Sequence, residues 1–96
     1  MTNHTKHMYL LAEVEPKFTK EKQLDIICLI GKYIDYRHYY DNDYNEWYCC
    51  ADQNPHPAYW SYLCTDKDFS KALAELVSQL IEDKVLNKDE VKGVLE

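Results

Sequence analysis

The sequence predicts an α+β domain in which a small antiparallel sheet of three to four strands carries helices on one face. Apolar side chains recur at helical spacing through residues 69–81. Residues 36–51 hold two alternating segments on either side of a turn that is rich in Asp and Asn. The expected order of elements is β-α-β-β-β-α-α, within one domain that spans residues 1–96 and begins with a flexible lead-in over residues 1–7.

The first half of the chain predicts a strand followed by a helix. Residues 7–15 alternate apolar and polar side chains, and Pro16 ends this strand. Thr19 is the expected N-cap of a helix that starts at Lys20. Its apolar positions follow helical spacing and predict a largely buried helix: Leu24, Ile26, Ile27, Cys28, Leu29, Ile30, Gly31 and Ile34.

The second half predicts a meander of three strands and then two helices. The strands are expected over residues 36–40, 46–51 and 58–64, with a turn at residues 41–43 and a loop at residues 53–57. Asp66 or Asp68 is the expected cap of the helix over residues 69–81. Asn87 caps a short final helix, with Glu90 at the capping-box position.

The charge is acidic and uneven along the chain. The formal net charge is −6, and residues 33–65 hold five acids but only one cation, Arg37. Direct binding of nucleic acid gains its affinity from Lys and Arg, so this charge disfavours nucleic acid as a ligand and favours a partner protein with a basic surface. No apolar run is long enough for a membrane span, and the N-terminal residues lack the apolar core of a secretory signal, so a cytoplasmic location is expected.

No motif in the chain assembles a catalytic or metal site. Cys49, Cys50 and Cys64 lie near His56 in sequence, but a Cys-x-x-Cys motif is missing and adjacent strand residues point to opposite faces. The four cysteines are therefore expected to be free, buried thiols. Residues 41–52 start like a calcium loop but lack its Gly and its final Glu. A Cys–His–Asp set with His38 and Asp35 lacks the turn of a nucleophile elbow, so no enzyme activity, cofactor or metal is expected.

The most informative feature is a concentration of aromatic and acidic residues. Ten of the thirteen aromatic residues lie between positions 33 and 62, more than a domain of this size buries completely. Tyr and Trp suit contact surfaces because they combine a large area with a polar group. The candidate partner-binding residues are Tyr36, Tyr40, Asp41, Asp43, Tyr44, Glu46, Trp47, Tyr59 and Trp60, with Tyr62 and Asp52 beside them.

The chain also resembles the small accessory proteins that phages and prophages encode. The resemblance rests on the compact α+β plan, the high Tyr and Asp content and the closing stretch LAELVSQLIEDKVLNKDEVKGVLE. It implies an anti-defence or anti-CRISPR-like inhibitor that binds a host protein, although the acids form no regular row like that of a DNA mimic.

The expected function is accordingly a non-enzymatic protein-binding module, acting as an acidic inhibitor of a host or defence protein. Two alternatives remain open. The aromatic rings could stack on a nucleotide or another small planar ligand, or the tyrosine-rich face could join two copies of the chain in a homodimer.

Overall fold

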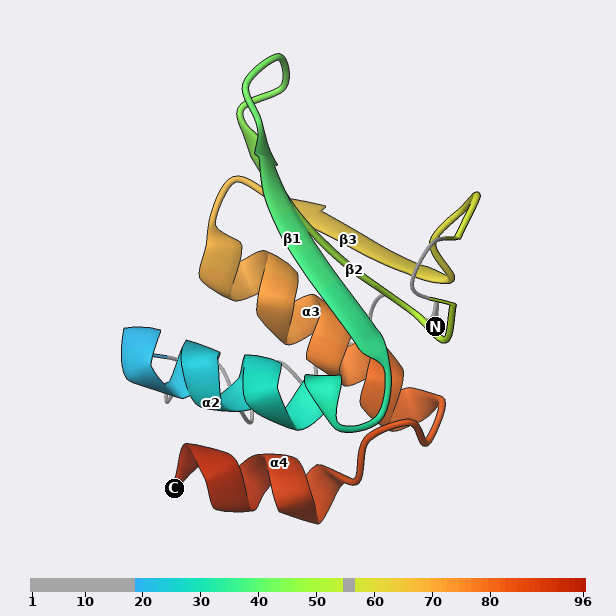
Figure 1. Cartoon of the computed structure of the whole chain (residues 1–96). Helices are drawn as coiled ribbons and strands as arrows, with labels where there is room; N and C mark the ends of the chain where they lie inside the picture. The colour runs from blue at the N-terminus through green and yellow to red at the C-terminus, as the bar shows by residue number, and fades with distance from the viewer. Residues whose placement is uncertain (1–18, 55–56) are drawn as a thin grey trace, which may run out of the picture.

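A computed structural model describes residues 19–54 and 57–96. The fold is α+β, as predicted, with a three-stranded antiparallel sheet and helices packed against it (Figure 1). The order of the described elements is α-β-β-β-α-α. The predicted first strand at residues 7–15, its terminating Pro16 and the lead-in at residues 1–7 lie outside the described residues.

Helix α2 (Lys20–Gly31) begins at the predicted cap, where the Thr19 hydroxyl accepts a hydrogen bond of 3.3 Å from the Lys22 amide. The prediction of a largely buried helix is only partly right. Ile26, Leu29 and Ile30 are buried, whereas Leu24 and Cys28 are exposed. The apolar stripe is wide enough to leave one flank outside the core, because the helix presents only one side to its neighbours.

The sheet is a meander in the order β1-β2-β3. Strands β1 (Asp35–Asp41) and β2 (Glu46–Asp52) form the predicted hairpin, with His38 opposite Cys49. Strand β3 (Tyr62–Asp66) starts four residues later than the predicted 58–64. The later start is due to hydrogen bonds that hold the preceding loop to the end of β2.

Helix α3 (Phe69–Glu82) has the strongest amphipathic pattern, and its cap is Asp68, whose carboxylate accepts a hydrogen bond of 2.9 Å from the Ser70 amide. Helix α4 (Lys88–Leu95) begins at the predicted cap Asn87. The predicted capping box is wrong in one respect, because the Glu90 carboxylate accepts hydrogen bonds of 2.8 and 3.0 Å from the Tyr33 hydroxyl instead.

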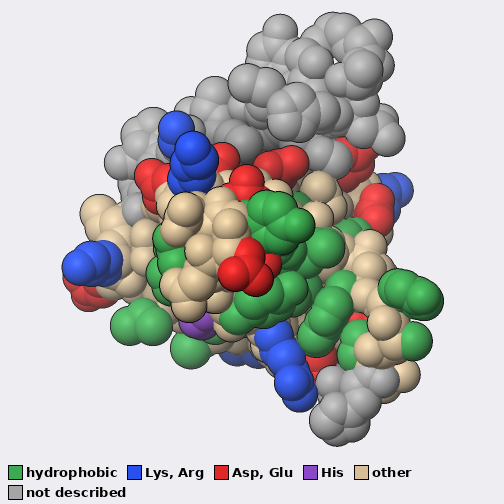
Figure 2. Space-filling model, turned by 90° about the horizontal axis from the view of Figure 1, so that it is seen from above, with side chains coloured by type: hydrophobic (Ala, Val, Ile, Leu, Met, Phe, Trp, Pro, Cys, Tyr) green, Lys and Arg blue, Asp and Glu red, His purple; other side chains and the backbone are tan. Residues whose placement is uncertain are grey.

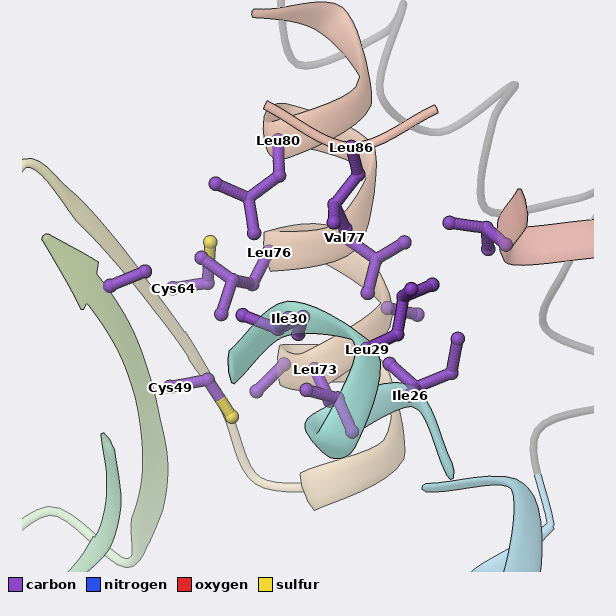
Figure 3. Packing of buried hydrophobic residues seen from close by; sticks show 14 of the residues in the cluster. Ile26, Leu29, Ile30, Cys49, Cys64, Leu73, Leu76, Val77, Leu80 and Leu86 are labelled. Atoms are coloured by element: carbon purple, nitrogen blue, oxygen red, sulfur yellow. The ribbon is translucent and has the colours of Figure 1, made fainter. Parts of the chain in front are cut away.

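The core lies between the sheet and the helices. Cys49 and Cys64 project from the strands toward Leu73 and Leu76 of α3, with Ile30 of α2 beside them (Figure 3). The opposite face of the sheet carries no described helix. The hairpin of β1 and β2 extends past the helices at one end (Figure 1), and this extension positions most of the predicted site.

Candidate partner-binding surface

The end of the β1–β2 hairpin is held in a defined shape by its own residues. One Asp41 carboxylate oxygen accepts a hydrogen bond of 2.8 Å from the Asp43 amide, which fixes the entry to the turn. Asn45 has a φ of 54°, in the left-handed region that Asn tolerates better than most residues. The Tyr40 hydroxyl donates to the Asn45 side-chain oxygen at 3.4 Å. The turn therefore presents its side chains from a structured base.

Residues 40–46 form the hairpin tip. It brings together five of the nine predicted site residues: Tyr40, Asp41, Asp43, Tyr44 and Glu46. Tyr44 is 70% exposed and Tyr40 is 41% exposed. Residues 40–46 carry three carboxylates and no Lys or Arg. A view onto this end of the molecule shows acidic side chains directly beside hydrophobic ones (Figure 2). The hairpin tip thus combines exposed aromatic side chains with a negative net charge.

Trp47 follows the hairpin tip along β2 and belongs to a cluster of rings on the helix side of the sheet. Its ring lies 5.1 Å from that of Phe69, 5.2 Å from that of Tyr40 and 6.2 Å from that of His38, all in edge-to-face geometry. His38 and Phe69 are also in edge-to-face contact at 5.1 Å. Edge-to-face pairs are favourable for aromatic rings, so the cluster supports the base of the hairpin.

The ring cluster borders a groove of about 550 Å³ between α2, the hairpin and the start of α3. The residues that line the groove are Lys20, Gln23, Leu24, Ile27, His38, Trp47, Asp68, Phe69 and Ser70. Gln23 donates a hydrogen bond of 3.0 Å from its amide nitrogen to the Ser70 hydroxyl and so joins α2 to α3. The groove was missed in the sequence because it is built from three elements that are distant along the chain.

Tyr36 is predicted as a contact residue but lies mostly within the fold. Its hydroxyl is 3.7 Å from the Cys49 sulfur, to which it donates, and 3.0 Å from His38 Nδ1. Burial, followed by the neighbouring Cys49 thiol, raises the pKa of the Tyr36 phenol well above its usual range. Tyr36 therefore packs beneath the hairpin and is not part of the exposed surface.

Tyr59 and Trp60 do not join the hairpin tip. They lie in the loop between β2 and β3, whereas Tyr44 lies in the turn between β1 and β2. In a meander these two connections are at opposite ends of the middle strand, which for seven residues means about 20 Å. Tyr59 is 90% exposed and Trp60 is half-buried. The predicted residues therefore divide into two separate surfaces.

Asp52, predicted at the rim of the candidate surface, is instead 8% exposed and holds the β2–β3 loop. One carboxylate oxygen accepts from the Ser61 hydroxyl at 2.6 Å and from the Ser61 amide at 2.9 Å, and the other accepts from the Asn54 amide at 2.8 Å. These hydrogen bonds, with the Ser61 hydroxyl first, lower the pKa of the Asp52 carboxyl. They also keep residues 57–61 out of the sheet and delay the start of β3.

The face of the sheet away from the helices carries a second aromatic pair. Tyr39 and Tyr48 lie opposite each other on β1 and β2 and stack with 4.7 Å between their ring centroids. Leu63 on β3, 48% exposed, lies on the same face. Tyr39 and Tyr48 stack face to face, and the rings of the Trp47 cluster meet edge to face. Neither group leaves a slot between two parallel rings for a planar ligand to enter.

The cysteines do not form a reactive or metal-binding group. Cys49 and Cys64 are opposite each other and face the core, whereas Cys50 faces the other side of the sheet, with its sulfur 3.4 Å from the Arg37 carbonyl oxygen. Burial raises the pKa of the Cys49 and Cys64 thiols to about 12. Within residues 19–54 and 57–96, no three His, Cys, Asp or Glu residues converge to hold a metal ion. His56 lies outside the described residues.

Comparison with protein-family models, with curated proteins and with solved structures finds no match to this chain. None of the helices in the described ranges has the length and apolar character needed to cross a membrane. The surface chemistry of the domain is therefore the basis for any functional conclusion.

Proposed function

We propose that this protein is a non-enzymatic protein-binding module whose hairpin tip engages a basic surface on its partner. The observation that carries the proposal is the projection of Tyr44, which is 70% exposed, from a structured turn among three carboxylates. Exposed tyrosines on a rigid base contribute contact area with little loss of conformational entropy. Carboxylates around them favour a partner rich in Lys and Arg and raise the rate of encounter with it.

The same chemistry fits an inhibitor. A hairpin that projects beyond the helices can enter a concave, basic site such as the nucleic-acid channel of a host or defence protein. Inhibition would then follow from occupancy of that site, without any reaction. This reading agrees with the resemblance to small phage and prophage accessory proteins, and the acidic hairpin tip supports it more directly than that resemblance does.

Capture experiments with three forms of the full chain test the proposal. The wild type, a hairpin-tip variant (Tyr44→Ala with Asp43→Asn) and a control variant (Tyr59→Ala) are tagged and passed through host lysate at low and moderate salt. We expect a basic protein that the wild type and the control capture equally, that the hairpin-tip variant loses, and that salt weakens. Tyr59 is the matched control because it is a more exposed tyrosine at the opposite end of the sheet.

Two results would count against the proposal. Equal capture by all three forms would remove the hairpin tip from the interface. Recovery of only the protein itself, in a concentration-dependent dimer, would make the tyrosine surface a contact between two copies of the chain.

A further inference from the structure

The face of the sheet away from the helices carries a row of acids beside a row of aromatic rings. The strand register places Asp41 opposite Glu46 at the end of the hairpin, and Tyr39 opposite Tyr48 in the next row on the same face. Side chains two residues apart on one face of a strand are about 7 Å apart. The two carboxylates therefore border the stacked tyrosines on the side of the hairpin tip.

The outer face of the Tyr39 ring is the accessible part of this stack. The two rings lie 4.7 Å apart with 14° between their planes, so their inner faces cover each other. Tyr39 is nevertheless 48% exposed. It lies on β1, an edge strand of the sheet that the structure describes, whereas Tyr48 lies on the middle strand between β1 and β3. A partner can thus reach Tyr39 from the open side without any change in the stack.

The carboxylates act electrostatically on both rings. Burial, followed by the charges of Asp41 and Glu46, raises the pKa of the Tyr48 phenol. Burial, the Cys50 thiol and then Asp41 raise the pKa of the Tyr39 phenol. A negative charge that disfavours a phenolate at these rings favours a cation at the same place.

The sheet itself supplies few cations. Among the residues of the three strands the only Lys or Arg is Arg37, and Lys67, which directly follows the end of β3, is separated from Tyr39 by β2. Arg37 lies opposite Cys50, in the row on the far side of the stack from the acids. The potential therefore becomes more negative from Arg37 toward the hairpin tip, and a cation of a partner is drawn to the acidic side of the Tyr39 ring.

These features fit an arginine side chain better than a lysine side chain. A guanidinium group is planar, stacks on aromatic faces and donates several N–H groups in a fixed geometry that matches a carboxylate. A cation is attracted to a tyrosine ring within about 6 Å of the ring centroid. Because the two rows are about 7 Å apart, a guanidinium on the outer face of Tyr39 also reaches the carboxylate of Asp41 on the same strand. The lysine ammonium is a compact and strongly hydrated charge, so it makes fewer of these contacts.

We infer that the outer face of Tyr39 binds an arginine side chain of the partner protein, whose guanidinium donates hydrogen bonds to the carboxylate of Asp41. This inference rests on the proposed function, and it adds the type of residue that is recognised and a contact next to the hairpin tip. One oxygen of Asp41 already accepts a hydrogen bond from the Asp43 amide, so its second oxygen is the acceptor. The carboxylate of Glu46, opposite Asp41, adds a second negative charge.

A titration of the isotopically labelled full chain with two synthetic peptides tests the inference. The arginine peptide alternates Arg and Ser over about ten residues, and the lysine peptide has Lys in place of every Arg, so that the two carry the same charge. We expect the arginine peptide to shift the ring signals of Tyr39 and to bind about fivefold more tightly than the lysine peptide. This preference should be lost in Tyr39→Leu, which keeps an apolar side chain beside Tyr48. It should be kept in Tyr59→Leu, which makes the same change at the opposite end of β2.

Each other outcome counts against a specific claim. If the two peptides bind equally and shift only Tyr44 and Asn45 signals, the arginine inference fails while the proposed acidic contact stands. If Tyr39→Leu keeps the preference for arginine, the preference arises elsewhere and the inference is wrong. If neither peptide shifts any signal, both the inference and the proposed contact are overturned. If the Tyr39 signals move with protein concentration alone, a second copy of the chain covers this face and the inference is wrong. The comparison of the two peptides on the wild type does not depend on the folding of either variant.

Discussion

Replacement of Tyr39 by leucine should weaken binding of the arginine peptide more than it destabilises the fold. A cross-strand aromatic pair contributes about 0.2–1 kcal/mol to stability, and leucine keeps part of this packing, so the loss of stability should be at most about 0.5 kcal/mol. A cation–π contact contributes about 0.5–1 kcal/mol at an exposed site and about 2 kcal/mol when water is excluded. Because Tyr39 is 48% exposed, an arginine that covers its outer face is partly shielded from water, and a loss of about 1 kcal/mol in binding is expected.

The expected loss of affinity follows from these values. An energy of about 1 kcal/mol corresponds to roughly fivefold in Kd. Isothermal titration calorimetry with the arginine peptide measures the change, and the Kd of the lysine peptide should rise by less than about twofold. Urea unfolding of the same variant should show a loss of stability no larger than about 0.5 kcal/mol.

Tyr59→Leu provides the matched control. Tyr59 is also an exposed tyrosine, at 90%, but it lies in the loop between β2 and β3, away from the stack. Its replacement should change the Kd less than about twofold, a difference of about 0.4 kcal/mol. An unchanged Kd for Tyr39→Leu, or equal losses in the two variants, would refute the assignment of an arginine to Tyr39.

Three further predictions concern the fold that supports the site. The native protein should show one rapidly modified thiol, Cys28, because it is exposed whereas the other three cysteines are buried and their thiol pKa values are raised; thiol titration with and without denaturant measures this. Because the pKa of Asp52 is lowered by folding, its stabilising contribution is complete above the ordinary carboxyl pKa of about 4 and is lost as the pH falls through the lowered value. The protection of the Ser61 amide against exchange, relative to its intrinsic rate, should fall there, and Asp52→Ala, which lacks the acceptor oxygens, should show low protection at every pH. Asn45→Val should destabilise the protein by about 1–2 kcal/mol in urea unfolding because its φ is positive, whereas Asn45→Gly should not, and equal effects would show that the turn does not need this conformation.

The parts of the fold that sequence patterns predicted correctly depend on neighbours along the chain. Thr19 and Asn87 cap their helices through amides two or three residues away, and the Asp41 side chain shapes its own turn. The amphipathic pattern of α3 likewise predicts most of its buried residues, because one stripe dominates, although Ala74 and Ser78 are buried as well. Such features are fixed by local chemistry, so they can be read from a single sequence.

The parts that sequence patterns missed depend on contacts between distant residues. The start of β3 is set by hydrogen bonds that the Ser61 amide and hydroxyl donate to the carboxylate of Asp52, nine residues away. The exposed flank of α2 follows from the direction in which the helix faces its neighbours, which the wide apolar stripe leaves open. Composition grouped Tyr59 with Tyr44, although a meander places their loops at opposite ends of the sheet. The groove needed α2, β2 and α3 in place before Leu24 and Phe69 could be assigned to it.

Site-specific photocrosslinking tests the central claim most directly. A photoreactive phenylalanine derivative replaces Tyr44 in one form of the protein and Tyr59 in another, and both are irradiated in host lysate. We expect a covalent adduct between position 44 and a basic protein, diminished by salt and missing from position 59. Equal adducts from both positions, or adducts of position 44 only with a second copy of the chain, would contradict it.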